Sequence, residues 1–302
     1  MTIFAFLLVT ISAFTHALWN FLGKRSNPAP TLFLMASLAS ALLFSPVLFF
    51  SWSALLEIPP QVWVLLLITS AVQAVYYIFL ASAYRNGDLS HVYPFARSLP
   101  VVLVAAVSLL LGRGDQIQPP AWLGFLLVTT GCLLLPLPDF SGIHPRHYRH
   151  TWVLFALLAA VCITAYTLID DQSLRILRST ADAGLSSLEW SLLYVELEAI
   201  GISVFMLFFL LPWRTQRAGF LHASGREWRT AFLMGFVITG TYGLVLLAMA
   251  YVSNVSYVIA FRQLSIPMGA ALGILGRKEP ASTPKLVGTV LVVVGLVLAA
   301  LG

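Results

Sequence analysis

Two arginines, Arg97 and Arg262, stand inside long apolar runs of the sequence. An arginine in hydrocarbon costs at least about 2.5 to 3.5 kcal/mol on insertion scales, so each must be paired or face a cavity. A guanidinium presents forked donors that match a carboxylate or a phosphonate. Both residues are therefore candidate contacts for an anionic cargo. A structural ion pair or a snorkelling side chain is the alternative for each.

Other polar and aromatic residues recur at helical spacing within the apolar runs. A polar stripe of this kind should line a cavity or hydrogen-bond neighbouring helices, because it should not face lipid. Tyrosines in such a stripe could stack on an organic cargo or belong to the core. With the two arginines, the predicted substrate-binding residues are Arg97, Arg262, His16, Trp19, Asn20, Gln73, Tyr77, Tyr93, Tyr166 and Gln263.

Three acidic residues in apolar runs, Glu196, Glu198 and Asp170, are candidates for proton coupling. A carboxyl group removed from water can gain and lose a proton in step with its cargo, as proton-coupled exchange requires. Glu196 and Glu198 are two residues apart on one predicted helix, so their side chains point in different directions. One could neutralise Arg97 or Arg262 while the other titrates.

The composition identifies the elements that must hold these residues. Apolar residues make up 59% of the 302 residues and charged residues only 10%, against about 25% in soluble domains. The apolar residues form runs of about twenty, the length of a helix that crosses a hydrocarbon core. Ten spans are predicted, at 2–23, 31–51, 61–84, 91–112, 121–138, 151–171, 186–212, 230–251, 255–276 and 284–301.

The basic residues indicate an orientation in the membrane. Loops after odd-numbered spans carry twelve of the seventeen lysines and arginines, and loops after even-numbered spans carry three. The positive-inside rule then places the odd loops in the cytoplasm and both termini outside. The net charge of +5 is spread over loops, so it does not indicate nucleic-acid binding.

The chain repeats itself across its midpoint. Ala83-Tyr84 aligns with Ala250-Tyr251, and Arg97 with Arg262 when small insertions are allowed. Near the end of each repeat, Pro120, Gly124 and Gly131 have the spacing of Pro284, Gly288 and Gly295. Glycines seven apart lie on one helix face and permit close helix packing.

We therefore predict an all-α polytopic membrane protein with ten transmembrane helices in two five-helix repeats, residues 1–138 and 151–302, joined by a linker at 139–150. Because each repeat has an odd number of spans, the second must be inverted relative to the first. Inverted repeats with a site near the midplane are a common plan of secondary transporters.

Four motifs add a family resemblance. In the first half they are His16-Ala17-Leu18-Trp19-Asn20 and Ala83-Tyr84-Arg85-Asn86-Gly87-Asp88-Leu89-Ser90, and in the second Thr164-Ala165-Tyr166-Thr167-Leu168-Ile169-Asp170 and Arg262-Gln263-Leu264-Ser265-Ile266-Pro267. The chain resembles the EamA branch of the drug/metabolite transporter superfamily over nearly its whole length. That resemblance implies a bacterial inner-membrane carrier with ten helices around a central cavity, typically an exporter of amino acids or other metabolites. Arg113 stands where the family often has glutamate.

The predicted function is secondary transport of a small polar organic metabolite that is anionic or zwitterionic, more often outward. The alternatives are a lipid scramblase, a non-transporting sensor and, least favoured, an intramembrane enzyme, since the sequence has no G-x-S-x-G, H-E-x-x-H or Walker motif. No catalytic residue, metal site or cofactor is expected. The expected partners are the substrate, the lipid bilayer and possible coupling protons, in a monomer or homodimer.

Overall fold

The computed structural model describes residues 2–23, 29–86, 89–134, 137, 139–142, 151–179, 185–268 and 282–301. Regular structure in these residues is entirely helical. The helices at the predicted spans of the first half are α1 (Ile3–Gly23), α2 (Pro30–Phe44), α5 (Pro60–Asn86), α6 (Leu89–Leu110) and α7 (Pro119–Leu134). Those of the second half are α8 (Thr151–Ser179), α9 (Ser187–Leu210), α11 (Gly225–Ala248), α12 (Val255–Arg262) and α14 (Thr283–Leu301).

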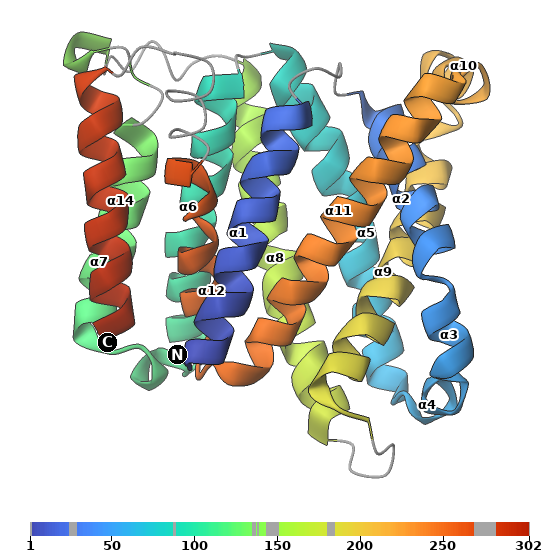
Figure 1. The fold of residues 1–302 in the computed structure, drawn as a ribbon, viewed down its shortest axis with the longest axis horizontal. Coiled ribbons are helices and arrows are strands. Elements are labelled where there is room, and N and C mark those ends of the chain that lie inside the picture. Colours follow the sequence, from blue (N-terminus) through green and yellow to red (C-terminus); the bar gives the residue numbers. More distant parts are fainter. Residues whose placement is uncertain are drawn as a thin grey trace.

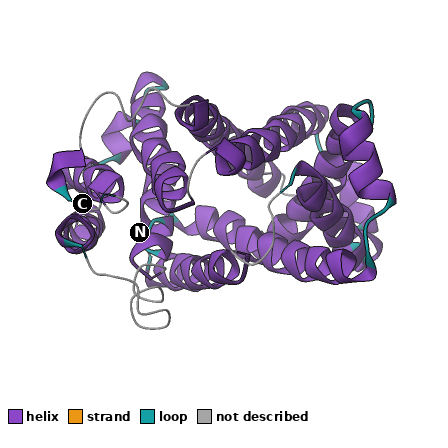
Figure 2. Cartoon of the chain, turned by 90° about the horizontal axis from the view of Figure 1, so that it is seen from above, coloured by secondary structure: helices purple, strands orange, loops and turns teal. Residues whose placement is uncertain are grey.

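The two halves run through the bundle in opposite senses. The chain begins with α1 at the face where α14 ends, which is called the termini face below, whereas α8 begins at the opposite face (Figure 1). The predicted inversion of the second half relative to the first is confirmed, while the predicted span 255–276 is described only as far as Met268. Viewed along the helices, α7 and α14 stand together at one end of the bundle (Figure 2).

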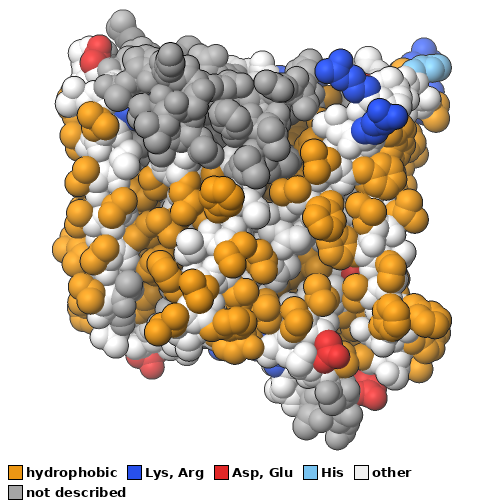
Figure 3. Space-filling view, viewed as in Figure 1, with side chains coloured by type: hydrophobic (Ala, Val, Ile, Leu, Met, Phe, Trp, Pro, Cys, Tyr) orange, Lys and Arg blue, Asp and Glu red, His pale blue; other side chains and the backbone are white. Residues whose placement is uncertain are grey.

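The outer surface suits a hydrocarbon environment. Five helices in the described residues are long and apolar enough to cross a membrane: Pro30–Phe50 taken as one span, α5, α8, α9 and Gly225–Tyr251. Large apolar side chains such as Phe49, Phe208 and Leu233 are exposed. Hydrophobic side chains cover most of the face seen in Figure 3, between the two ends where charged groups gather.

The helix contacts reproduce the inverted repeat. In the repeat, α1, α2, α5, α6 and α7 correspond in order to α8, α9, α11, α12 and α14. The contact of α5 with α8 therefore corresponds to that of α11 with α1, and the contact of α6 with α8 to that of α12 with α1. All four contacts are present, as are the self-related pairs α2 with α9, α6 with α12 and α7 with α14. The bundle therefore has a pseudo-twofold relation between its halves.

The glycines of the sequence repeat meet one another across the α7–α14 contact. A Cβ atom on Gly124 would lie 2.5 Å from the Gly295 carbonyl oxygen, and one on Gly131 would lie 2.6 Å from the Gly288 carbonyl oxygen. These contacts involve backbone atoms, which cannot move aside like a side chain. The prediction that these glycines permit close packing is confirmed.

Several helix bounds differ from the predicted spans. The predicted span 31–51 is broken at Ser45, because Pro46 has no N–H for the Leu42 carbonyl, which accepts from the Ser45 hydroxyl at 2.8 Å instead. The predicted span 151–171 is too short, since α8 continues to Ser179. The additional residues include Arg175 and Arg178, whose side chains hydrogen-bond to Asp171 and to the Leu246 carbonyl. These partners allow the two arginines to lie within the helix instead of in a solvent-exposed loop. Short helices α3 (Pro46–Phe50), α4 (Trp52–Glu57) and α10 (Arg214–Leu221) lie beside the long ones.

Candidate substrate cavity

A cavity of about 1,120 Å³, part of it open to solvent, lies between the two halves. Side chains of α1, α2, α5 and α6 line it from the first half, and those of α8, α9, α11 and α12 from the second. Among the ten helices at the predicted spans, only α7 and α14 contribute no described lining residue.

Six of the predicted binding residues line this cavity: His16, Gln73, Tyr77, Arg97, Tyr166 and Arg262. Gln263 does not line it, because its side-chain amide turns back to donate to the Ile259 carbonyl at 3.1 Å. The side chains of Trp19, Asn20 and Tyr93 lie outside the described residues.

The acidic candidates separate into different environments. Glu198 lines the cavity, whereas Asp170 is fully buried directly behind its wall. Glu196 is also fully buried but is not part of the lining, and neither of its carboxyl oxygens has a hydrogen-bond partner. The directions of Glu196 and Glu198 therefore differ as their spacing predicts.

Arg262 lies at a helix break, against the ring of Tyr242. It is the last residue of α12, and regular helix resumes only at Ser265. Pro267 has no N–H to bond the Gln263 carbonyl, which favours an interruption at this place. The Tyr242 ring centroid lies 5.5 Å from the Arg262 guanidinium carbon, and Tyr166 contacts the Tyr242 ring edge to face. A cation over an aromatic face is attracted by the ring quadrupole.

Arg97 faces the same space from α6. Both arginines are largely buried, with 6% of Arg97 and 7% of Arg262 exposed. The charges of both reach His16 on α1 and Tyr166 on α8, so the two cations act on one region of the cavity. The sequence repeat thus brings its two arginines to a common site.

A hydrogen-bonded chain connects the two acids through the first half. The Gln73 amide donates to a Glu198 carboxyl oxygen at 2.5 Å and to the Thr69 hydroxyl at 3.4 Å. Thr69 in turn donates to an Asp170 oxygen at 2.7 Å. Asp170 and Glu198 are thus linked through Thr69 and Gln73, while the second Glu198 carboxyl oxygen, Oε2, has no hydrogen-bond partner among the described residues.

Two tyrosines complete the environment of Asp170. Tyr194 donates to one carboxyl oxygen at 3.1 Å, and the hydroxyl of Tyr242 donates to the other. Tyr242 therefore contacts Asp170 through its hydroxyl and Arg262 through its ring. The acid pair and the cation are connected through this one side chain.

Aromatic rings form a continuous part of the wall. Phe33 stacks on Tyr77 with ring centroids 4.9 Å apart. Tyr76 contacts Tyr166 edge to face at 5.8 Å, and Tyr166 contacts Tyr242 at the same distance. Such a wall offers apolar area together with hydroxyl groups, which suits a cargo with an organic body.

Tyr242, Tyr194 and Phe33 were not among the predicted site residues. A signal for Tyr242 exists in the repeat: when Ala83 is paired with Ala250, Tyr242 falls within one position of Tyr76. For Tyr194 and Phe33 the sequence offers no distinguishing pattern, because each lies in an apolar run of aromatic and aliphatic residues.

Comparisons with known proteins identify the fold and its family. Residues 3–136 match the family described as the EamA-like transporter family. These residues belong to the EamA-like transporters of the drug/metabolite transporter superfamily. One solved structure, described only as the crystal structure of a protein, is 16% identical over 98% of this chain and 97% of its own, with a TM-score of 0.67. No curated protein matches the chain.

The match to the EamA-like transporter family indicates a multi-pass membrane transporter, and the cavity has chemistry that suits the binding of a small polar molecule. Two cations, one lining carboxyl group and several hydroxyls surround it, with aromatic rings between them. The matched segment ends before α8, so the acids Asp170 and Glu198 lie in the half that the family match does not cover.

Proposed function

We propose that the protein exports a small organic metabolite with an anionic group, such as an amino acid or another organic acid, by alternating access across the inner membrane. The observation that carries this proposal is the presence of Arg97 and Arg262, one from each half, in the lining of a single cavity. Two buried guanidiniums in one cavity favour a ligand with negative charge, because their forked donors match a carboxylate.

The other lining residues support a zwitterion or an acid with an organic body. Glu198 can receive a cationic group while the arginines hold the anionic one. The aromatic wall from Phe33 to Tyr242 provides surface for the apolar part. A small inorganic anion would leave this wall unused.

The proposed orientation places the termini face outside the cell. Arg214 and Arg217 on α10, together with Arg226 and Arg229 at the start of α11, lie at the opposite end, where basic side chains are visible in Figure 3. This distribution follows the positive-inside rule. Outward movement is the direction typical of the family that the chain resembles.

Proton coupling is proposed to use the pair formed by Glu198 and Asp170. A proton shared between two carboxyl groups can leave when a cationic group or a rearranged arginine approaches. The contacts of Tyr242 with Asp170 and with Arg262 provide the link to the cargo site. Glu196 has no comparable connection to the cavity residues.

The test uses thermal shifts of purified protein with matched ligands: amino acids, the amines that lack their carboxyl group, and the corresponding amino alcohols. A binding acid should raise the midpoint of unfolding, and its carboxyl-free analogues should not. Arg97→Gln and Arg262→Gln should each weaken binding by at least about tenfold, because each removes a charge-assisted hydrogen-bonding group.

Arg85→Gln is the matched control, since Arg85 is exposed at the end of α5 and does not line the cavity. It should bind like the parent. Counterflow of the identified acid in proteoliposomes then separates a carrier from an enzyme, which would change the compound chemically, and from a scramblase, which would move lipid. If both cavity variants bind and exchange acids as the parent does, the proposed cargo site is wrong.

A further inference from the structure

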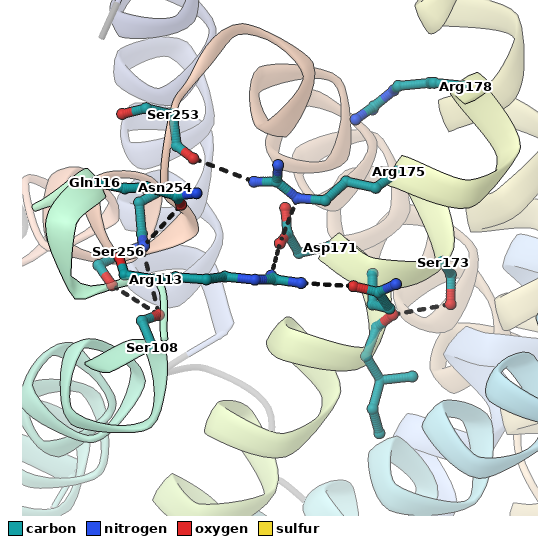
Figure 4. Close-up of polar contacts among 12 residues, drawn as sticks. Ser108, Arg113, Gln116, Asp171, Ser173, Arg175, Arg178, Ser253, Asn254 and Ser256 are labelled. Atoms are coloured by element: carbon teal, nitrogen blue, oxygen red, sulfur yellow. Dashed lines mark hydrogen bonds and ion pairs between the residues drawn. The ribbon is translucent and has the colours of Figure 1, made fainter. Parts of the chain in front are cut away.

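A second charged cluster lies near the termini face, away from the cavity lining. Asp171, only 1% exposed, accepts from Arg113 at 3.2 Å and from Arg175 at 2.9 Å. Arg113 also donates to Gln172 at 2.7 Å, and Arg175 to the Ser253 carbonyl at 3.3 Å. Figure 4 shows both guanidiniums directed at the one carboxylate.

The buried side chain of Asn254 extends this cluster to the loop that precedes α12. Its amide donates to the Arg113 carbonyl at 3.3 Å and to Gln116 at 3.4 Å, while its oxygen accepts from Ser108 at 3.4 Å. Arg113 and Ser108 belong to the first half, whereas Asp171 and Asn254 belong to the second. The cluster therefore ties the two inverted halves together.

The cluster is stacked below the cavity on three helices that also carry cavity residues. On α8, Asp171 lies about 7.5 Å along the axis from Tyr166. On α6, Ser108 lies about 16 Å from Arg97, and on α12, Ser256 lies about 9 Å from Arg262. Between the two levels the space is filled by fully buried residues, including Val104, Val258 and Ile259.

Neighbouring residues of α8 connect the two levels. Asp170 contacts Thr69, Tyr194 and Tyr242 next to the cavity, and Asp171 holds the two arginines of the cluster. A helix transmits a rotation or shift along its axis because its backbone is rigid. A change in the contacts of Asp170 would therefore displace Asp171 from its partners.

We propose that Arg113, Asp171 and Arg175 form the gate that closes the cavity toward the termini face, and that α8 couples its opening to the state of Asp170. This proposal rests on the transport function proposed above. Opening toward the termini face requires the halves to separate there, and the cluster is a charged contact that links them. Asp171 pairs with Arg175 on its own helix and with Arg113 of the other half. The pair with Arg113 can therefore break on opening and form again on closing.

The test measures access to the cavity without any cargo. A cysteine replaces Ala199, a cavity-lining residue, in a protein carrying Cys132→Ala and Cys162→Ala. A charged, membrane-impermeant maleimide is applied to right-side-out and to inside-out vesicles in separate preparations. Arg113→Gln should raise the labelling rate from the termini face at least about fivefold, because it removes the link between the halves.

Asp115→Asn is the matched control: it lies in the same short connection as Arg113, is exposed, and has no hydrogen bond or ion pair shown in the described structure. It should label as the parent does. Arg113→Lys, which keeps a cation, should lie near the parent. Arg175→Gln should give a smaller rise of about twofold, since Arg113 still holds Asp171.

Folding is followed separately with the native Cys132, a fully buried residue of α7, in proteins lacking Cys162. It should remain unlabelled in every folded variant. If Arg113→Gln unfolds, Arg175→Gln decides the question in its place. Unchanged labelling from the termini face in the folded variants overturns the gate and leaves the proposed cargo site standing. Raised labelling together with no binding of any acid supports the gate and overturns the cargo assignment.

Discussion

The α7–α14 pair and the bundle of α5, α8, α9 and α11 show two different uses of an inverted repeat. In the first, glycines at equivalent positions of the two halves meet backbone to backbone, with Gly124 against Gly295 and Gly131 against Gly288. In the second, the halves carry different side chains: the acids Asp170 and Glu198 come from the second half, while Gln73 and Thr69 come from the first.

The difference follows from what each contact must do. A close backbone contact needs only a small residue on each side, so symmetry preserves it in both halves. A binding site needs a donor opposite an acceptor, which two identical residues cannot provide when both are acids or both are cations. The repeat is therefore preserved where helices pack and in the two cavity arginines, and it diverges where a donor of one half meets an acceptor of the other.

The largest expected effect comes from breaking the symmetric contact. Gly295→Ala would place a methyl group 2.6 Å from the Gly124 carbonyl oxygen and 2.8 Å from the Val128 nitrogen. Neither backbone atom can move alone, so α7 and α14 must separate. The expected loss is about 2 kcal/mol or more, seen as a fall of about 3 °C or more in the thermal midpoint of the purified protein.

Gly240→Ala on α11 is the control for this change, because nothing lies within 4 Å of the added carbon. It should leave the midpoint unchanged or raise it slightly, since alanine favours helix more than glycine does. Equal losses at positions 240 and 295 would show that helix propensity, and not the close contact, determines the result.

An intermediate effect is expected from the divergent contact. Glu198→Gln keeps the size of the side chain but removes the second carboxyl group from the pair with Asp170. Counterflow measured across a pH series should lose its pH dependence in this variant, because one carboxyl group can no longer share a proton with the other. Glu196→Gln should retain the parental profile, and a flat profile in that variant instead would assign coupling to Glu196.

The sequence predicted the repeated part of the molecule better than the divergent part. Span number, inversion and the glycine contact follow from apolar run lengths and from residues that recur at a fixed spacing. The two arginines could be found because a cation in an apolar run is unusual wherever it lies. These features are local or are repeated within the chain itself.

The pairings of the site could not be predicted in the same way. Asp170 and Asp171 are adjacent and chemically identical, yet one joins Tyr242 and the other joins Arg113. Which partner each finds depends on the rotation of α8 against α5, α11 and the connection at 113. Tyr242 was missed for the same reason, since a tyrosine in an apolar run is ordinary until its neighbours are known.

The smallest expected effect isolates the link between the acid pair and the cation. Tyr242→Phe keeps the ring over Arg262 but removes the hydroxyl that donates to Asp170. One lost hydrogen bond to an acidic group corresponds to a change of about threefold to tenfold in the affinity for the acid identified by thermal shift. Tyr194→Phe removes the other hydroxyl bound to Asp170, but its ring does not line the cavity. The affinity for the acid should therefore fall more in Tyr242→Phe than in Tyr194→Phe. Equal losses would mean that the two hydroxyl groups contribute equally through Asp170 and that the contact of Tyr242 with Arg262 does not link the acid pair to the cargo site.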